Sequence, residues 1–199
     1  MGQELKELIL KRRTSKPVNF SAQKPNPTLI RELIETARHA PNHHRTEPAR
    51  FYLLDAERIA EVGRLFGEVV AGDGSDLKLV ERGKKKEREW GCAPGLLIVT
   101  CHTDLDSELA RKKPTVIEEN YATCSCICQN LLLLFENEGI SSKWSTGPVF
   151  DHPEFTDAIG MMEPDCEQVV ALLFYGYSET ALPQRAYLPL EDHLRDYTG

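Results

Sequence analysis

The 199-residue chain has no hydrophobic segment long enough to cross a membrane. Its apolar runs, such as residues 131–135, are far shorter than the ~20 residues that a membrane-spanning helix needs. The N-terminal stretch MGQELKELILKRR is charged throughout and lacks both an apolar core and a small-residue cleavage site, so no secretion signal is expected. Six cysteines without such a signal favour reduced thiols. We therefore expect a cytoplasmic protein without a membrane partner.

The chain also lacks an excess of positive charge, because its net charge is −7 at pH 7. A general nucleic-acid-binding protein needs a basic face that neutralises phosphates, so no nucleic-acid partner is expected. The one basic run, RGKKKER at 82–88, is flanked by Glu81 and Glu89. A solvated helix face is favoured there over a phosphate-binding patch. Internal repeats and low-complexity segments are missing too, and the length suits one domain over residues 1–199.

Hydrophobic periodicity predicts an α+β fold with a small sheet of about four strands. Helices are expected at 3–13, 28–39 and 55–70, in a polar segment that follows the Gly/Asp cluster at 72–76 and ends at Trp90, and centrally from Thr115 to Glu138. Strands are expected at 50–54, 95–101 and 168–176. The last two are nearly continuous apolar runs, which is typical of strands covered on both faces. Thr115 and Glu118 have the spacing of a capping box at the start of the long helix.

Three cysteines, Cys124, Cys126 and Cys128, lie within five positions of the predicted central helix. On a helix Cys124 and Cys128 share a face, whereas Cys126 points roughly the other way. One zinc ion could not gather all three, and no Cys-x₂-Cys pair completes a tetrahedral set. Small buried thiols that pack the core are favoured over a cysteine metal site, and no metal is expected.

Four polar stretches are better candidates for a functional site. LKRRTSK (10–16) suits a phosphate, although basic residues also stabilise a helix C-terminus. ARHAPNHHRTEPARF (37–51) is a polar loop whose adjacent histidines are a poor metal chelate without further ligands. GISSKWSTGPVF (139–150) offers backbone donors for an anion or a heterocycle edge, or is a Gly-Pro turn with a core tryptophan. LPQRAYLPLEDHL (182–194) suits a partner subunit, or delivers Arg185 to a site.

In order and spacing, these stretches resemble motifs of the nitroreductase family of FMN-dependent oxidoreductases, in its compact, YdjA-like branch. The resemblance covers nearly the whole chain and rests on four segments: RRTSKPVNF, APNHHRTEPARF, YATCSCICQNLLLLFENEGISSKWSTG and FYGYSETALPQR with PLEDHL. The family pattern has a tryptophan where this chain has Ala49. The resemblance implies an α+β fold with a mostly antiparallel sheet, and an intertwined homodimer with FMN at the subunit interface.

The resemblance also implies roles for individual residues. Arg12 and Thr14, with Arg13 beside them and Arg185 from the tail, would bind the FMN phosphate. Lys16 would lie near the N1/O2 edge of the ring, where a cation stabilises reduced flavin. The residues expected from the partner subunit are Pro41, Asn42, His43 and Arg45. Those expected along the other ring edge, with a backbone N–H near N5, are Trp144, Ser145, Thr146 and Gly147.

The activity that the resemblance implies is ping-pong hydride transfer from NAD(P)H through FMN to a nitroaromatic, quinone or similar small oxidant. No catalytic side-chain acid or nucleophile is required, since the flavin carries the hydride chemistry. A missing G-x-G-x-x-G fingerprint is no objection, because the nicotinamide would bind transiently over the flavin. A flavin-binding or sensing protein with little NAD(P)H turnover is the alternative.

Overall fold

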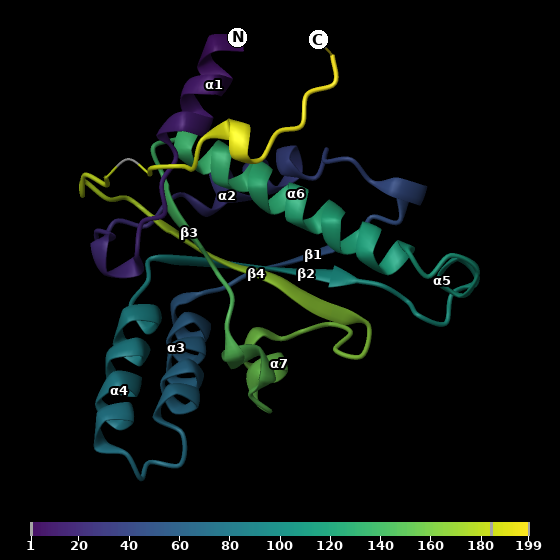
Figure 1. Cartoon of the computed structure of the whole chain (residues 1–199). Helices are drawn as coiled ribbons and strands as arrows, with labels where there is room; N and C mark the ends of the chain where they lie inside the picture. Colours follow the sequence, from purple (N-terminus) through teal and green to yellow (C-terminus); the bar gives the residue numbers. More distant parts are fainter. Residues whose placement is uncertain (1, 184, 199) are drawn as a thin grey trace.

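The computed structural model describes residues 2–183 and 185–198. A four-stranded sheet lies between two helical layers: α2 and α6 cover one face, and α3, α4 and α7 lie on the other (Figure 1). The helices are α1 Gly2–Lys11, α2 Pro27–Ala37, α3 Ala56–Ala71, α4 Leu77–Gly91, α5 Glu108–Lys112, α6 Val116–Asn137 and α7 Phe155–Ile159. The strands are β1 Ala49–Leu53, β2 Gly95–His102, β3 Ser141–Ser145 and β4 Glu167–Gly176. Short 3-10 helices are η1 Pro17–Asn19, η2 His43–Arg45, η3 Pro148–Asp151 and η4 Leu190–Asp192.

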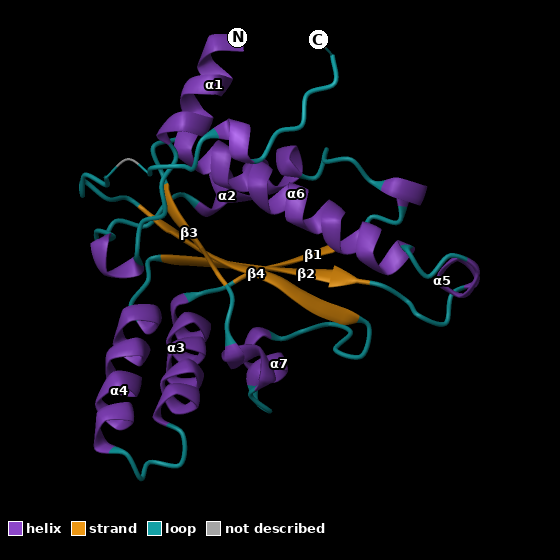
Figure 2. Cartoon of the chain, viewed as in Figure 1, coloured by secondary structure: helices purple, strands orange, loops and turns teal. Residues whose placement is uncertain are grey.

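The sheet has the strand order β1-β2-β4-β3, and all neighbouring strands are antiparallel (Figure 2). Alternate residues of the central strands enter two separate cores. Leu97 and Val99 of β2 pack toward α6, whereas Leu96 and Ile98 pack toward α3. Because both faces of β2 and β4 are covered, their sequences are continuously apolar rather than alternating. The prediction of two doubly covered strands in an α+β fold is confirmed.

The fourth strand, β3, lies inside the stretch 139–150, where the sequence predicted a functional stretch or a Gly-Pro turn and no strand. Its sequence SSKWS is polar, because β3 is an edge strand with only one strand neighbour. A short half-buried edge strand carries too few apolar residues to give a strand signal on its own. Its partner β4 determines its conformation, through the pairing of Ser141 with Gly176 and of Ser145 with Leu172.

The central helix α6 is confirmed, but the capping box at its start is wrong. Thr115 has helical dihedral angles, and its side chain makes no capping hydrogen bond. A turn before the helix takes over this role: the N–H of Val116 donates to the carbonyl of Lys113 and that of Ile117 to Pro114. Since these amides are already paired, the helix needs no side-chain cap there.

The cysteines of α6 do not converge on one point. Cys124 and Cys128 are fully buried against the sheet, whereas Cys126 is exposed. The expectation of buried thiols is therefore right for two of the three and wrong for Cys126, which lies on the outer face of the helix. This geometry leaves no single position from which an ion could reach all three sulfur atoms.

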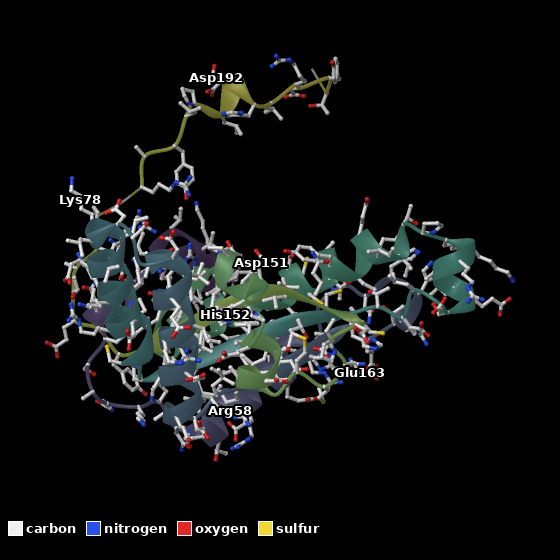
Figure 3. All side chains as sticks on the ribbon, turned by 90° about the horizontal axis from the view of Figure 1, so that it is seen from below. Arg58, Lys78, Asp151, His152, Glu163 and Asp192 are labelled. Atoms are coloured by element: carbon white, nitrogen blue, oxygen red, sulfur yellow. The ribbon has the colours of Figure 1, made fainter. Side chains whose placement is uncertain are left out.

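The chain beyond β4 leaves the body of the molecule as an extended segment. Figure 3 shows Asp192 on a stretch that stands away from the rest. Its large apolar side chains are solvent-exposed: Tyr187, Leu188, Leu190, Leu194 and Tyr197. Within the described residues, no helix combines the length and apolar character needed to cross a membrane.

Candidate functional site

The turn RRTSK is attached to the edge strand β3. Thr14 forms a parallel bridge with Ser142, and the backbone N–H of Ser15 donates to the carbonyl oxygen of Ser142 at 3.0 Å. This pairing draws the chain out of the helix, so α1 ends at Lys11 rather than at residue 13 as predicted. The predicted phosphate-binding turn and the predicted flavin-edge segment 144–147 thus lie along one edge of the sheet.

The two arginines of this turn differ in their contacts. Arg13 turns back onto α1, where its Nη1 donates to the carbonyl oxygens of Leu10 at 2.6 Å and Arg12 at 2.8 Å. That is the helix-stabilising role that the sequence left open as an alternative. Arg12 is half-buried, and its guanidinium has no hydrogen bond or ion pair among the described residues. Arg12, with the exposed Thr14 and Lys16 beside it, is therefore the side chain available for an anion.

Buried polar atoms without partners collect at this edge. Within the described residues five buried side-chain atoms lack a hydrogen bond, and three of them are Arg13 Nε, Ser15 Oγ and Ser145 Oγ. Buried polar groups in native proteins are nearly always paired. Ser15 lies within the RRTSK turn and Ser145 within the segment 144–147, the two segments that resemble flavin-binding motifs. Two hydroxyls and a guanidinium N–H are donors of the kind that phosphate oxygens accept from, so the residues present fit a phosphate-bearing cofactor.

Positive charge extends from Lys16 to a lysine that the sequence analysis missed, Lys143 of β3. Its Nζ lies 5.7 Å from the ring centre of Trp90 and 6.0 Å from that of Phe174. Burial lowers the pKa of Lys143, and the positive charges of Lys86 and Lys16 lower it further, whereas Glu89 opposes them. A lysine within an otherwise small, hydroxyl-rich stretch was the only sequence signal for this residue.

The basic run on α4 contributes to the same region through one residue. Lys86 is partly buried and donates to Glu89 Oε2 at 2.7 Å, and the Glu89 side chain is itself buried. Most of the run is exposed, as the solvated-face interpretation expects. For Lys86 that interpretation is wrong, because the helix packs against α3 and turns this side chain toward Lys143.

The predicted flavin-edge segment 144–147 begins in the last two residues of β3 and continues past its end. Trp144 is half-buried and packs against the core under α6, as the core-tryptophan alternative expects. Thr146 is exposed, and Gly147 has an extended backbone with a position for Cβ 3.8 Å from the Phe66 ring. The backbone N–H groups of Thr146 and Gly147 thus lie beside α3.

A second group of predicted residues lies in the loop between α2 and β1. Asn42 Oδ1 accepts from the N–H of Thr46 at 3.2 Å, and the Thr46 hydroxyl lies 2.6 Å from Asn120 Oδ1. Thr123 donates to the carbonyl oxygen of Pro41 at 3.0 Å. The loop is therefore tied to α6, and Asn42 holds it in place.

Three non-glycine residues of this loop have left-handed backbone conformations: His44 (φ 59°), Arg45 (φ 54°) and Glu47 (φ 45°). Such conformations are costly for these residue types, and they cluster at functional sites where the surrounding structure enforces them. A cavity of about 650 Å³ opens beside the loop, lined in part by Arg45, Ala49 and Ile127. Ala49, at the position of a tryptophan in the family pattern that the sequence resembles, is one of its lining residues.

The two groups of predicted residues are at opposite edges of the sheet. The loop 41–47 leads into edge strand β1, while the RRTSK turn and the segment 144–147 flank edge strand β3. With strands ~4.8 Å apart, three spacings separate the edges by about 14 Å. One chain therefore does not bring both groups into a single pocket. Arg185 joins neither group, since its contact among the described residues is with the Tyr187 ring at 5.0 Å.

The order of elements defines an α+β protein with a nitroreductase-type fold. A nitroreductase-like protein from Bacillus cereus superimposes with a TM-score of 0.77 at 23% identity, over 98% of this chain and 96% of that one. A nitroreductase from Bacteroides fragilis solved with bound FMN gives 0.70 at 22% identity, over 94% and 95%. The sequence profile of the nitroreductase family matches residues 9–177, and the chain belongs to that family.

One sequence relative matches almost end to end. YfhC of Bacillus subtilis, which carries the provisional name NAD(P)H nitroreductase, is 28% identical over 197 residues. The match covers 96% of this chain and 93% of YfhC.

Proposed function

We propose that this chain is an FMN-dependent oxidoreductase that takes hydride from NAD(P)H and delivers it to a small oxidant such as a nitroaromatic or a quinone. The observation that carries the proposal is the unpaired buried polar set at the β3 edge, Arg13 Nε, Ser15 Oγ and Ser145 Oγ. Family membership, the FMN bound by the Bacteroides fragilis relative and the name of YfhC support it.

The residues of this chain would divide the work of holding and tuning the cofactor. Arg12 and Thr14 would bind the phosphate, because a guanidinium and a hydroxyl both donate to phosphate oxygens. Lys16, reinforced by Lys143, would supply positive charge where reduced flavin becomes negative. The backbone N–H groups at 146–147 would donate to the other ring edge. Bound FMN would supply the hydride chemistry itself.

We further propose that the active unit is a homodimer in which the loop 41–47 of one copy completes the site of the other. The separation of the two residue groups across the sheet supports this, because a second copy supplies the missing half. Two uncovered apolar surfaces support it as well. One is the tail with Tyr187 and Leu190, and the other is a hollow on α6 around Tyr121 and Cys126.

The visible spectrum of the purified protein tests the enzymatic proposal. After FMN addition and gel filtration, the protein should keep a flavin absorbance band. Anaerobic NADH or NADPH should bleach the band on the timescale of turnover, and a quinone should restore it. A colourless protein contradicts FMN binding. A bound flavin that neither nucleotide bleaches contradicts the enzyme and leaves the flavin-binding alternative.

Mixed dimers test the shared site. An Arg12→Ala chain and an Asn42→Ala chain should each be inactive alone, because every dimer then lacks half of both sites. Co-refolded one to one, half of the dimers pair the two variants, and each of these has one intact site, so about a quarter of all sites regain activity. Lys11→Gln, which removes the exposed cation of an ion pair with the largely buried Glu136, serves as the control variant. No recovery, together with a monomeric mass in solution, contradicts the proposed dimer.

A further inference from the structure

Three side chains with metal-binding atoms meet where η2 contacts α6. They are His43, His44 and Glu119. One nitrogen of each histidine and one carboxylate oxygen all lie within 4.8 Å of one another. His43 Nε2 is 4.0 Å from Glu119 Oε2, and the two imidazole rings are nearly perpendicular with centres 4.0 Å apart. The tertiary structure thus adds a third donor to the adjacent histidine pair.

One oxygen of the Glu119 carboxylate has unmet hydrogen bonding, although the side chain as a whole is 37% exposed. Glu119 Oε2 is buried, and it has no hydrogen-bond partner among the described residues. A buried carboxylate oxygen without a partner is costly, and a cation at this point would remove the cost. This second observation is independent of the clustering, because it concerns the unmet bonding of one atom.

The backbone of the loop brings the histidines together. His44 has φ 59° and ψ 5°, a left-handed conformation inside η2 that turns its ring against that of His43. The brace between Thr46 and Asn120 holds the same loop on α6. Strain maintained by surrounding contacts is frequent where a site is preorganised.

We propose that His43, His44 and Glu119 form a reversible binding site for a borderline-soft divalent cation such as Zn²⁺. Two imidazoles and a carboxylate suit zinc, whereas Mg²⁺ and Ca²⁺ prefer sites made of oxygen ligands. Ligands at ~2.0–2.2 Å from an ion are closer together than these atoms are now, so the side chains must move inward slightly. In the single chain the His43 side chain is 61% exposed, so no neighbouring group of the same chain blocks this movement. Three protein ligands leave a coordination position for water, which favours exchangeable rather than structural binding.

Ion binding would regulate the flavin site, and this consequence rests on the proposed function. His43 is one of the residues proposed to line the flavin of the partner subunit. When His43 is held on an ion, it is withdrawn from that position, so Zn²⁺ should inhibit NAD(P)H oxidation and a chelator should reverse the inhibition.

The direct test measures binding to the metal-free full chain. The exposed thiols Cys92 and Cys126 are first replaced by serine, so that they do not compete for the ion. Isothermal titration with Zn²⁺ gives the affinity, and Co²⁺ absorbance reports nitrogen and oxygen coordination. The variants are Glu119→Gln, which keeps the side-chain shape, and His44→Asn, because asparagine tolerates the left-handed backbone. Glu118→Gln removes the same charge from an exposed neighbour and is the matched control.

The site predicts one ion per chain, and an affinity that falls in both variants by at least the roughly 10–100-fold that loss of even an outer-shell partner costs. Glu118→Gln should bind as the parent does. Equal affinity in all three variants, or no binding to the parent, overturns the site. Binding without inhibition of turnover overturns the regulatory consequence alone. A chain that binds Zn²⁺ as predicted but never reduces flavin contradicts the proposed function and leaves the ion site supported.

Discussion

The backbone N–H of Ser15 donates to the carbonyl oxygen of Ser142 at 3.0 Å, which attaches the N-terminal turn to the far edge of the sheet. These residues lie on segments distant in sequence, yet they place Arg12 and Lys16 along the strand that leads to Gly147. Half of the proposed flavin site therefore depends on an edge strand with little apolar character. The predictions that follow concern this edge, the opposite loop, and the packing behind them.

Lys16→Gln removes a positive charge that would stabilise reduced flavin, so it should lower the two-electron midpoint potential of bound flavin. The expected shift is only about 20 mV, because Lys16 is exposed and water screens its charge. Equilibration with a redox dye of known potential measures the shift. Lys11→Gln, which removes a more distant exposed charge, should leave the potential unchanged. Equal shifts in both variants would show a general charge effect rather than a specific role for Lys16.

Asn120→Ala should loosen the loop 41–47, since the buried amide lies 2.6 Å from the Thr46 hydroxyl and donates to Thr103 at 2.9 Å. Losing these partners is expected to lower the free energy of unfolding by about 1–3 kcal/mol and to weaken FMN binding. Urea denaturation and flavin titration measure the two effects. Asn137→Ala, at the exposed end of α6, is the control. Reduced stability with unchanged FMN affinity would show that the conformation of the loop does not contribute to FMN binding.

Tyr52 and Glu167 form a buried pair, with the Tyr52 hydroxyl 2.8 and 2.7 Å from the two carboxylate oxygens. Tyr52→Phe removes a donor from a carboxylate that also accepts from Thr100 and from the N–H of Glu163. We expect a loss of about 1–3 kcal/mol in the free energy of unfolding near pH 7, measured by urea denaturation.

The same pair should give a distinctive dependence on alkaline pH. Burial raises the pKa of Tyr52 to about 12, and the hydrogen bond and charge of Glu167 reinforce this, although the N–H of Met162 opposes it. The folded chain thus favours the protonated Tyr52 phenol. The contribution of this phenol to the free energy of unfolding is complete below pH ~10 and disappears as the pH rises toward 12. The stability difference between wild type and Tyr52→Phe should be constant up to pH 9 and shrink above pH 10. A constant difference throughout would contradict the raised pKa.

The α3–α4 pair depends on a close backbone approach at Gly63. A Cβ there would lie 2.5 Å from the backbone nitrogen and 2.6 Å from the Cα of Gly91. Gly63→Ala should force the helices apart and cost about 1–3 kcal/mol, measured by thermal and urea unfolding. Gly91→Ala is a matched comparison, because its Cβ would meet Ala60 at an ordinary 3.4 Å. If the two variants lose equal stability, the close approach is not the cause.

The sequence predicted best those elements whose hydrophobic pattern depends directly on which of their faces are buried. The runs at 95–101 and 168–176 are continuously apolar because both faces are covered, and β2 and β4 follow them closely. The long stretch without glycine or proline likewise indicated α6. The two site segments were indicated by their resemblance to family motifs, and the family match over residues 9–177 agrees with that resemblance.

Contacts between distant segments were decided by tertiary structure alone. The polar strand β3 exists because β4 pairs with it, and Arg13 folds back because the chain leaves α1 toward Ser142. Glu119 reaches His43 and His44 only because the loop is braced on α6. A local pattern records whether a segment is buried, and so the sequence by itself determined the layers and the family. Register and packing determine which segments meet, and so only the fold separated the two halves of the site and brought the third metal-binding side chain to the histidine pair.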